Sequence, residues 1–189
     1  MAIKIYIDQG HNPRDFNTGA EGNGYFEQDI TYDIGIRLYN LLLSNPEFEP
    51  RLSRPTPDTV RGTSNSSSLR VRVDEANDWG ADIYLSLHVN SAANSSATGN
   101  EALVYGPTST VAVGLGTQIL EQLTLTTGLR NRGIVYRPGL YVLRESEMPA
   151  VLVEMGFISN PYDADLLANS PYLFSTGIYR GILKYYGLI

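Results

Sequence analysis

The sequence contains no cysteine and only two histidines. Disulfide bonds and thiolate metal ligands are therefore excluded, and any bound metal must be held by histidine and carboxylate groups. The chain also lacks a lysine- or arginine-rich block: Lys and Arg total 14, Asp and Glu total 20, and the formal net charge is -6. We therefore expect no nucleic-acid partner and no attraction to anionic lipid.

Long apolar runs are absent as well. No run approaches the roughly 20 residues that a membrane-spanning helix needs, so we expect no membrane span. The opening MAIKIYID has no signal-peptide layout and leads directly into a predicted strand, which leaves the route of any export open. With 189 residues and 42% apolar content, the chain can form a full hydrophobic core, and we expect one domain over residues 1–189.

Short apolar segments alternate with segments of helical periodicity along the chain. The apolar runs predict buried strands at 3–7, 83–87, 102–105 and 151–153. Apolar residues three or four apart predict helices at 30–42, 69–76, 115–123 and 173–186. Residues rich in Pro, Gly, Ser and Asn predict mobile surface loops at 54–68 and 91–100. This order predicts an α/β fold with a mostly parallel sheet covered by helices on both faces.

Three predicted strands end in groups that carry chemistry. IYID leads into His11, IYLSL leads into His88, and AVLV leads into Glu154. Ligands of parallel sheets bind at the carboxyl ends of strands, and neutral imidazole is the commonest metal ligand. The two histidines are therefore predicted metal ligands, although a hydrogen-bonded structural role is the alternative for each. A catalytic zinc usually has three protein ligands and an open position, so a third ligand is required.

The third ligand should be a carboxylate, and two residues compete for this role. Glu27 stands just before the apolar stripe of the first predicted helix, close in sequence to His11. An acidic residue at that place could equally serve only to compensate the helix dipole. Glu21, in the Gly-rich segment GAEGNG, is the competing ligand.

Two further carboxylates have both a chemical and a structural interpretation. Glu154, at the end of a buried strand, should have a raised pKa and could act as a general base toward water at a metal centre. Its alternative role is a buried ion pair with Arg72 or Arg144. Asp8 could orient His11, but we expect it to cap the turn after its strand.

Four segments in order resemble the zinc-dependent N-acetylmuramoyl-L-alanine amidases of bacterial cell walls, phage endolysins and spore lysins. They span residues 7 to about 163 and read IDQGH, YFEQDI, RVDEANDWGADIYLSLHVNS and PAVLVEMGFISNPYD. The resemblance implies a mostly parallel twisted sheet flanked by helices. It also implies that His11, Glu27 and His88 bind one Zn2+ per chain and that Glu154 is the catalytic glutamate. Gln9 stands where members often have proline, which should change loop stiffness more than chemistry.

The activity that the resemblance implies is hydrolysis of the amide bond between N-acetylmuramic acid and L-alanine in peptidoglycan. Action outside the cell or at the cell wall follows from it, and a separate cell-wall-binding module could accompany the catalytic domain. Among the 13 tyrosines, those expected in loops, Tyr25, Tyr136 and Tyr141, could stack on sugar or peptide.

Two other functions are compatible with the same residues. A glycosidase could use Glu27 and Glu154 as its acid and base, with both histidines binding sugar. A noncatalytic peptidoglycan-binding module could keep the fold without the reaction. Neither a G-x-S-x-G elbow nor a P-loop occurs, so a serine hydrolase and a nucleotide-binding protein have no support in the sequence.

Overall fold

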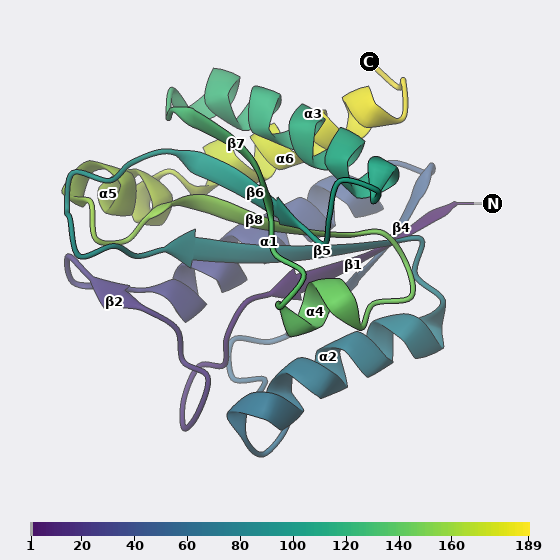
Figure 1. The fold of residues 1–189 in the computed structure, drawn as a ribbon, viewed down its shortest axis with the longest axis horizontal. Helices are drawn as coiled ribbons and strands as arrows, with labels where there is room; N and C mark the ends of the chain where they lie inside the picture. Colours follow the sequence, from purple (N-terminus) through teal and green to yellow (C-terminus); the bar gives the residue numbers. More distant parts are fainter. Residues whose placement is uncertain (1) are drawn as a thin grey trace.

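A twisted six-stranded sheet forms the centre of the computed structural model, which describes residues 2–189 (Figure 1). The strand order is β4-β1-β5-β8-β6-β7. Strands β4, β1, β5 and β8 are parallel, and β6 and β7 run in the opposite direction. The strands are β1 (Ile3–Gln9), β4 (Phe48–Leu52), β5 (Ile83–Asn90), β6 (Asn100–Val104), β7 (Asn131–Tyr136) and β8 (Ala150–Phe157), and a separate hairpin pairs β2 (Glu21–Gly22) with β3 (Tyr25–Phe26).

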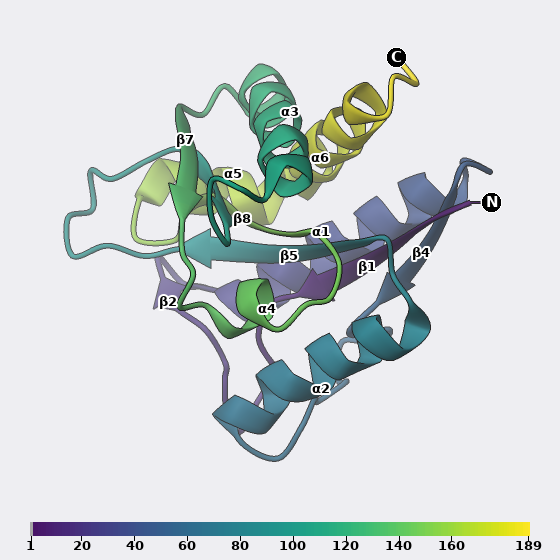
Figure 2. The ribbon, with the colours of Figure 1, turned by 45° about the vertical axis from the view of Figure 1, so that its right-hand side comes forward.

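Helices cover both faces of the sheet. Successive side chains of each strand point to opposite faces, so each face carries its own apolar core. In β1, Ile5 and Ile7 join the core on one face, and Tyr6 joins the core on the other. Figures 1 and 2 show α3 and α6 on one side of the sheet and α2 with α4 on the other. The first face packs against α1 (Glu27–Leu43), α3 (Thr110–Thr127), α5 (Pro161–Asn169) and α6 (Pro171–Tyr185), and the second packs against α2 (Asn65–Trp79) and α4 (Tyr141–Arg144).

The predicted α/β class and the mostly parallel sheet are confirmed. One loop prediction is partly wrong, because α2 begins at Asn65, inside the segment 54–68. The Ser64 side chain accepts from the Ser67 amide, and the Ser67 side chain accepts from the Ser64 amide, so the pair starts the helix. Arg54, at the start of the same segment, is buried rather than mobile on the surface, and its Nη1 donates to the Gln28 carbonyl at 2.9 Å.

The carboxyl ends of β1 and β5 meet at a switch in chain direction. From β1 the chain crosses through α1 to β4 on one side, whereas β5 pairs with the other edge of β1. Ligands of open α/β sheets bind outside such a switch point. Within residues 2–189 no helix has the length and apolarity needed to cross a bilayer.

Gln9 is the last residue of β1, so it lies in the sheet rather than in the following loop. Its backbone amide donates to Ser53 Oγ at 3.0 Å, and its Oε1 accepts from the Arg54 amide at 2.8 Å. The buried Gln9 side chain packs against Gly35 of α1, where an added Cβ would overlap Gln9 Cγ.

The contact between α3 and α6 depends on a glycine. A Cβ added at Gly181 would overlap the Ile119 Cα, whereas a Cβ added at Gly114 would only meet the Tyr185 ring, at 3.1 Å from Cε2. We predict that Gly181→Ala lowers the free energy of unfolding by about 1–3 kcal/mol, because the two helix backbones must separate. Urea denaturation of the purified protein measures this loss.

Gly114→Ala is the matched control for this prediction. It also replaces a helical glycine, and a ring can move aside, so we expect it to be neutral or to stabilise the protein by up to about 1 kcal/mol. Equal stability of Gly181→Ala and the wild type would contradict the close helix contact.

Candidate metal centre

The Glu27 carboxylate lies between the two histidines of the chain. Its Oε1 is 3.1 Å from His11 Nε2 and 3.1 Å from His88 Nδ1. Backbone amides hold it in place: Val89 donates to Oε1 and Ala20 donates to Oε2, each at 2.9 Å. Glu27 is the first residue of α1, so the sequence prediction that it opens the helix is correct.

The electrostatics of this group keep Glu27 ionised. Burial by itself would raise the pKa of its carboxyl, but the hydrogen bonds with His11 and His88 and the charge of these rings outweigh burial and hold the pKa below its usual value. Glu27 therefore presents an anionic oxygen to the two rings at neutral pH.

His11 has an unusual backbone and a defined ring orientation. Its φ is 72°, in the left-handed region that non-glycine residues rarely adopt. Its Nδ1 lies 3.2 Å from the carbonyl oxygen and 3.1 Å from the side-chain oxygen of Asn17. Because both Asn17 atoms are acceptors, Nδ1 carries a ring proton, and Nε2 is the nitrogen that faces Glu27 and the candidate metal position.

The three residues fit a zinc ion by their chemistry and spacing. One ligand atom from each of His11, Glu27 and His88 lies within 4.8 Å of the other two. Bonds of about 2.0–2.1 Å to a tetrahedral zinc place neighbouring ligand atoms about 3.3 Å apart, close to the spacing around Glu27 Oε1. Two imidazoles and one carboxylate also make up a common donor set of catalytic zinc.

Two glycines, which have no side chain, make space for the side chains of the candidate ligands. A Cβ added at Gly10 would lie 2.6 Å from His88 Cε1 and 2.6 Å from the Leu87 carbonyl oxygen. A Cβ added at Gly19, whose φ is 84°, would lie 2.8 Å from His11 Cδ2 and 2.9 Å from Glu27 Oε2. Larger residues at either position would displace a candidate ligand.

Glu154 lies beside the candidate ligands on the neighbouring strand. In β8 it is paired in register with His88 of β5 on one side and with Glu101 of β6 on the other. Burial raises the pKa of Glu154 to about 8, and the charges of Glu27 and Glu101 add to this effect. Its Oε2 is buried and has no hydrogen-bond partner among the residues that the structure describes.

The ion pairs proposed as the alternative role of Glu154 are not formed. Arg72 pairs with Asp8, and Arg144 pairs with Glu145. Glu154 is therefore a buried carboxyl group that neither of these arginines neutralises.

Asp8 corrects one prediction, because it is not the cap of a turn. Its side chain points to the face of the sheet that α2 covers, where Arg72 Nη1 donates to Oδ1 at 2.5 Å. Ser86 Oγ, on the adjacent strand β5, donates to Oδ2 at 2.8 Å. Asp8 pairs with the buried Arg72 guanidinium rather than with a turn, because leaving this buried charge unpaired would cost more free energy than leaving the turn uncapped.

The remaining candidates lie outside the group of three. Glu21 is exposed in β2 and contributes no atom to the cluster of candidate metal ligands. Tyr25 is tied to α5, because its hydroxyl accepts from Asn169 Nδ2 at 3.1 Å. Tyr136 is 48% exposed at the end of β7, and the Tyr141 ring packs against the Arg144 guanidinium.

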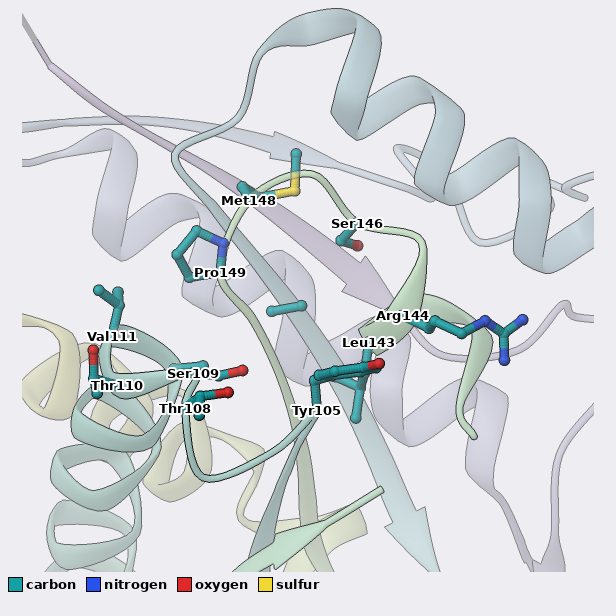
Figure 3. A pocket seen from close by; sticks show the side chains of 12 residues that line it. Tyr105, Thr108, Ser109, Thr110, Val111, Leu143, Arg144, Ser146, Met148 and Pro149 are labelled. Atoms are coloured by element: carbon teal, nitrogen blue, oxygen red, sulfur yellow. The ribbon is translucent and has the colours of Figure 1, made fainter. Parts of the chain in front are cut away.

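A separate cavity of about 360 Å³ lies at the opposite end of β8. Thr108 and Ser109, before the first turn of α3, line this space together with Pro149 and Met148 (Figure 3). Neither Glu154 nor a candidate metal ligand lines it.

Comparisons with known proteins identify the family of the chain. The sequence profile of the N-acetylmuramoyl-L-alanine amidase family matches residues 5–184. The chain belongs to this amidase family. It is 36% identical to the N-acetylmuramoyl-L-alanine amidase CwlM of Bacillus licheniformis over 178 residues, 92% of this chain and 64% of that protein. It is also 36% identical to the sporulation-specific N-acetylmuramoyl-L-alanine amidase of Bacillus subtilis, of which it covers 63%.

Solved structures of amidases have the same fold. The N-acetylmuramoyl-L-alanine amidase from Clostridium difficile 630 superposes with a TM-score of 0.87 at 30% identity and covers 98% of this chain and 97% of that one. The catalytic domain of CwlV from Bacillus (Paenibacillus) polymyxa superposes with a TM-score of 0.84 at 28% identity, over 99% of both chains. The resemblance inferred from the four sequence segments is thus confirmed at the level of the family.

Sequence reasoning missed the role of several residues that support the candidate metal centre. Asn17 binds the His11 ring, and Arg72 binds the backbone on both sides of Gly10. Arg72 begins the third of the segments that resemble the family, which was its available signal. Gly10, directly before His11, and Gly19, two residues before Glu21, were a second signal, since glycine often marks a close approach of chain segments.

A substitution at Gly10 tests whether the candidate ligands need the space that this glycine leaves. We predict that Gly10→Ala weakens zinc binding by about 10- to 100-fold, the usual cost of disturbing residues around a metal site, because the new methyl group displaces the His88 ring. Competition with a chromophoric chelator measures the affinity, and circular dichroism checks folding.

Gly106→Ala is the control, because an added Cβ there meets no described atom within 4 Å. Wild-type zinc affinity in a folded Gly10→Ala protein would show that His88 does not need this space.

Proposed function

We propose that residues 1–189 form the catalytic domain of a zinc-dependent N-acetylmuramoyl-L-alanine amidase. The substrate is peptidoglycan, and the bond cleaved is the amide between the lactyl group of N-acetylmuramic acid and L-alanine. One observation carries the proposal: His11, Glu27 and His88 converge beside the unpaired Glu154, in a chain that matches the amidase family over residues 5–184.

His11, Glu27 and His88 would hold one zinc ion per chain. When bound there, zinc supplies Lewis-acid polarisation of the scissile carbonyl and activates water at neutral pH. The protein prepares the donors in advance: Asn17 fixes the ring of His11, and two backbone amides fix the Glu27 carboxylate.

Glu154 is the proton carrier in this proposal. It accepts a proton from the attacking water as the carbon–oxygen bond forms, and it passes that proton to the leaving nitrogen as the carbon–nitrogen bond breaks. A pKa raised to about 8 lies near neutral pH, which suits a group that first accepts and then releases a proton. The buried, unpartnered Oε2 of Glu154 supports this role.

The cell wall is the proposed place of action, outside the cytoplasm. The chain spans less than two thirds of the length of the B. licheniformis and B. subtilis amidases to which it is 36% identical. A separate cell-wall-binding module is therefore proposed as a partner of this domain. Tyr136 and Tyr141 are proposed to contact sugar or peptide, and no nucleic-acid partner is expected of a chain with a net charge of -6.

The two carboxylate candidates for the metal can be separated by mutation. We predict that Glu27→Ala loses most of the bound zinc, because the anionic oxygen between the histidines is removed. Glu21→Ala should keep about one zinc per chain, since Glu21 lies outside the group. Elemental analysis of both purified variants gives the answer, and the reverse result would make Glu21 the ligand.

Metal binding and proton transfer can be separated in the same way. His11→Ala and His88→Ala should lose both zinc and amide hydrolysis, because each removes a lone pair from the site. Glu154→Gln should keep zinc but lose hydrolysis by about 100- to 10,000-fold, because an amide cannot accept the proton. Release of L-alanine amino termini from peptidoglycan measures the reaction, and circular dichroism checks folding. Near wild-type hydrolysis by zinc-loaded Glu154→Gln would remove Glu154 from the mechanism.

The same assay distinguishes the other two functions. Release of reducing sugar ends that persists in a chelator would support a glycosidase that uses Glu27 and Glu154. Binding to peptidoglycan without new amino termini would support a noncatalytic wall-binding module. Chelator-sensitive release of amino termini supports the amidase.

A further inference from the structure

Arg72 is a fully buried arginine at the middle of α2, with 1% of its surface exposed. Its Nη1 donates to the Gln9 carbonyl at 2.7 Å and to Asp8 Oδ1 at 2.5 Å. Its Nη2 donates to the His11 carbonyl at 2.6 Å. One planar group therefore binds the carbonyls on both sides of Gly10.

These contacts determine the backbone that carries His11. The left-handed φ of 72° at His11 is unfavourable for a residue with a side chain, and such conformations persist only where the surroundings impose them. The two carbonyls held by Arg72 belong to the peptide planes between Gln9 and Gly10 and between His11 and Asn12, so Arg72 restrains the backbone on both sides of His11. Nη2 also donates to Asn12 Oδ1 at 3.2 Å, which extends the restraint past His11.

The network also reaches the strand that carries His88. Asp8 neutralises the buried guanidinium, and Ser86 Oγ donates to the second oxygen of Asp8 at 2.8 Å. Ser86 and His88 lie two residues apart in β5, so their side chains leave the strand on the same face. Arg72 and Asp8 thus place the end of β1 relative to β5.

We propose that Arg72, with Asp8 as its counter-ion, is a positioning residue that holds His11 in the conformation needed to share a metal with Glu27 and His88. This inference rests on the proposed zinc function and adds a requirement to it. The requirement is a planar, two-nitrogen donor. A lysine at this place could neutralise Asp8, but its single nitrogen could not bind both carbonyls in the fixed geometry of a guanidinium.

Metal affinity of the full chain tests the proposal. Zn2+ affinity is measured by competition with a chromophoric chelator, and the visible absorption of bound Co2+ reports the arrangement of the ligands. We expect Arg72→Lys to bind zinc about 10- to 100-fold more weakly and to give an altered Co2+ spectrum, because the charge is kept and only the fork is lost.

Val73→Ala is the control for a general loss of stability. Val73 is the next residue of α2, is equally buried, and belongs to the apolar cluster that contains Tyr6 and Tyr84. Its removal should lower the melting temperature and leave the zinc affinity and the Co2+ spectrum of the folded protein unchanged. An equal loss of affinity in Val73→Ala would mean that Arg72 acts only through stability and would overturn the proposal.

Two other outcomes also overturn it. Wild-type affinity and spectrum in Arg72→Lys would refute the positioning role while leaving the zinc function intact, whereas absence of zinc binding by the wild type would refute both. If Arg72→Lys does not fold, Asp8→Asn decides, because it removes the counter-charge and keeps the shape. A loss of about tenfold or more supports the proposal, and wild-type affinity in folded Asp8→Asn rejects it.

Discussion

The arrangement of this edge of the sheet depends on the contacts that surround the buried Glu27 carboxylate. An ionised carboxylate shielded from water is costly unless donors surround it. Its donors come from the end of β1, the segment before β2, and β5, so these segments must meet at the first turn of α1. The N-terminal end of the helix dipole adds a favourable positive potential at the same place. The group that stabilises the meeting of these segments is also the candidate metal ligand.

The reversed direction of β6 places a second acidic residue beside Glu154. Because β6 runs antiparallel to β8, Glu101 lies directly opposite Glu154 in register, and two acidic side chains share one face. Like charges opposite one another are unfavourable in a sheet. Glu101 receives Arg132 Nε at 3.0 Å and Asn90 Nδ2 at 3.1 Å, which compensates its own charge. Oε2 of Glu154 has no such donor among the described residues. Besides burial, the repulsion between the two carboxyl groups therefore raises the pKa of Glu154.

The sequence predicted the features that depend on local pattern and on the direction of strands. Apolar runs located β1, β5, β6 and β8, and the polar residues that end β1, β5 and β8 do meet at one edge. It did not locate β4 and β7, which are short edge strands with alternating or largely exposed side chains. The Asp8–Arg72 pair joins residues 64 apart in the chain, and no spacing rule reaches so far. Periodicity therefore gave the scaffold and the chemistry at strand ends, but not the long-range pairs that orient it.

The contact between Gln9 and Gly35 has a consequence for the divergence of this family. The Gln9 side chain occupies the volume that a methyl group at position 35 would need, and its backbone amide serves Ser53, which a proline could not do. A substitution at one of these two positions therefore favours a compensating substitution at the other. A shorter residue at position 9 opens a void that alanine at position 35 could fill, whereas either change alone leaves a cavity or an overlap. Related chains should show correlated substitution at these two positions.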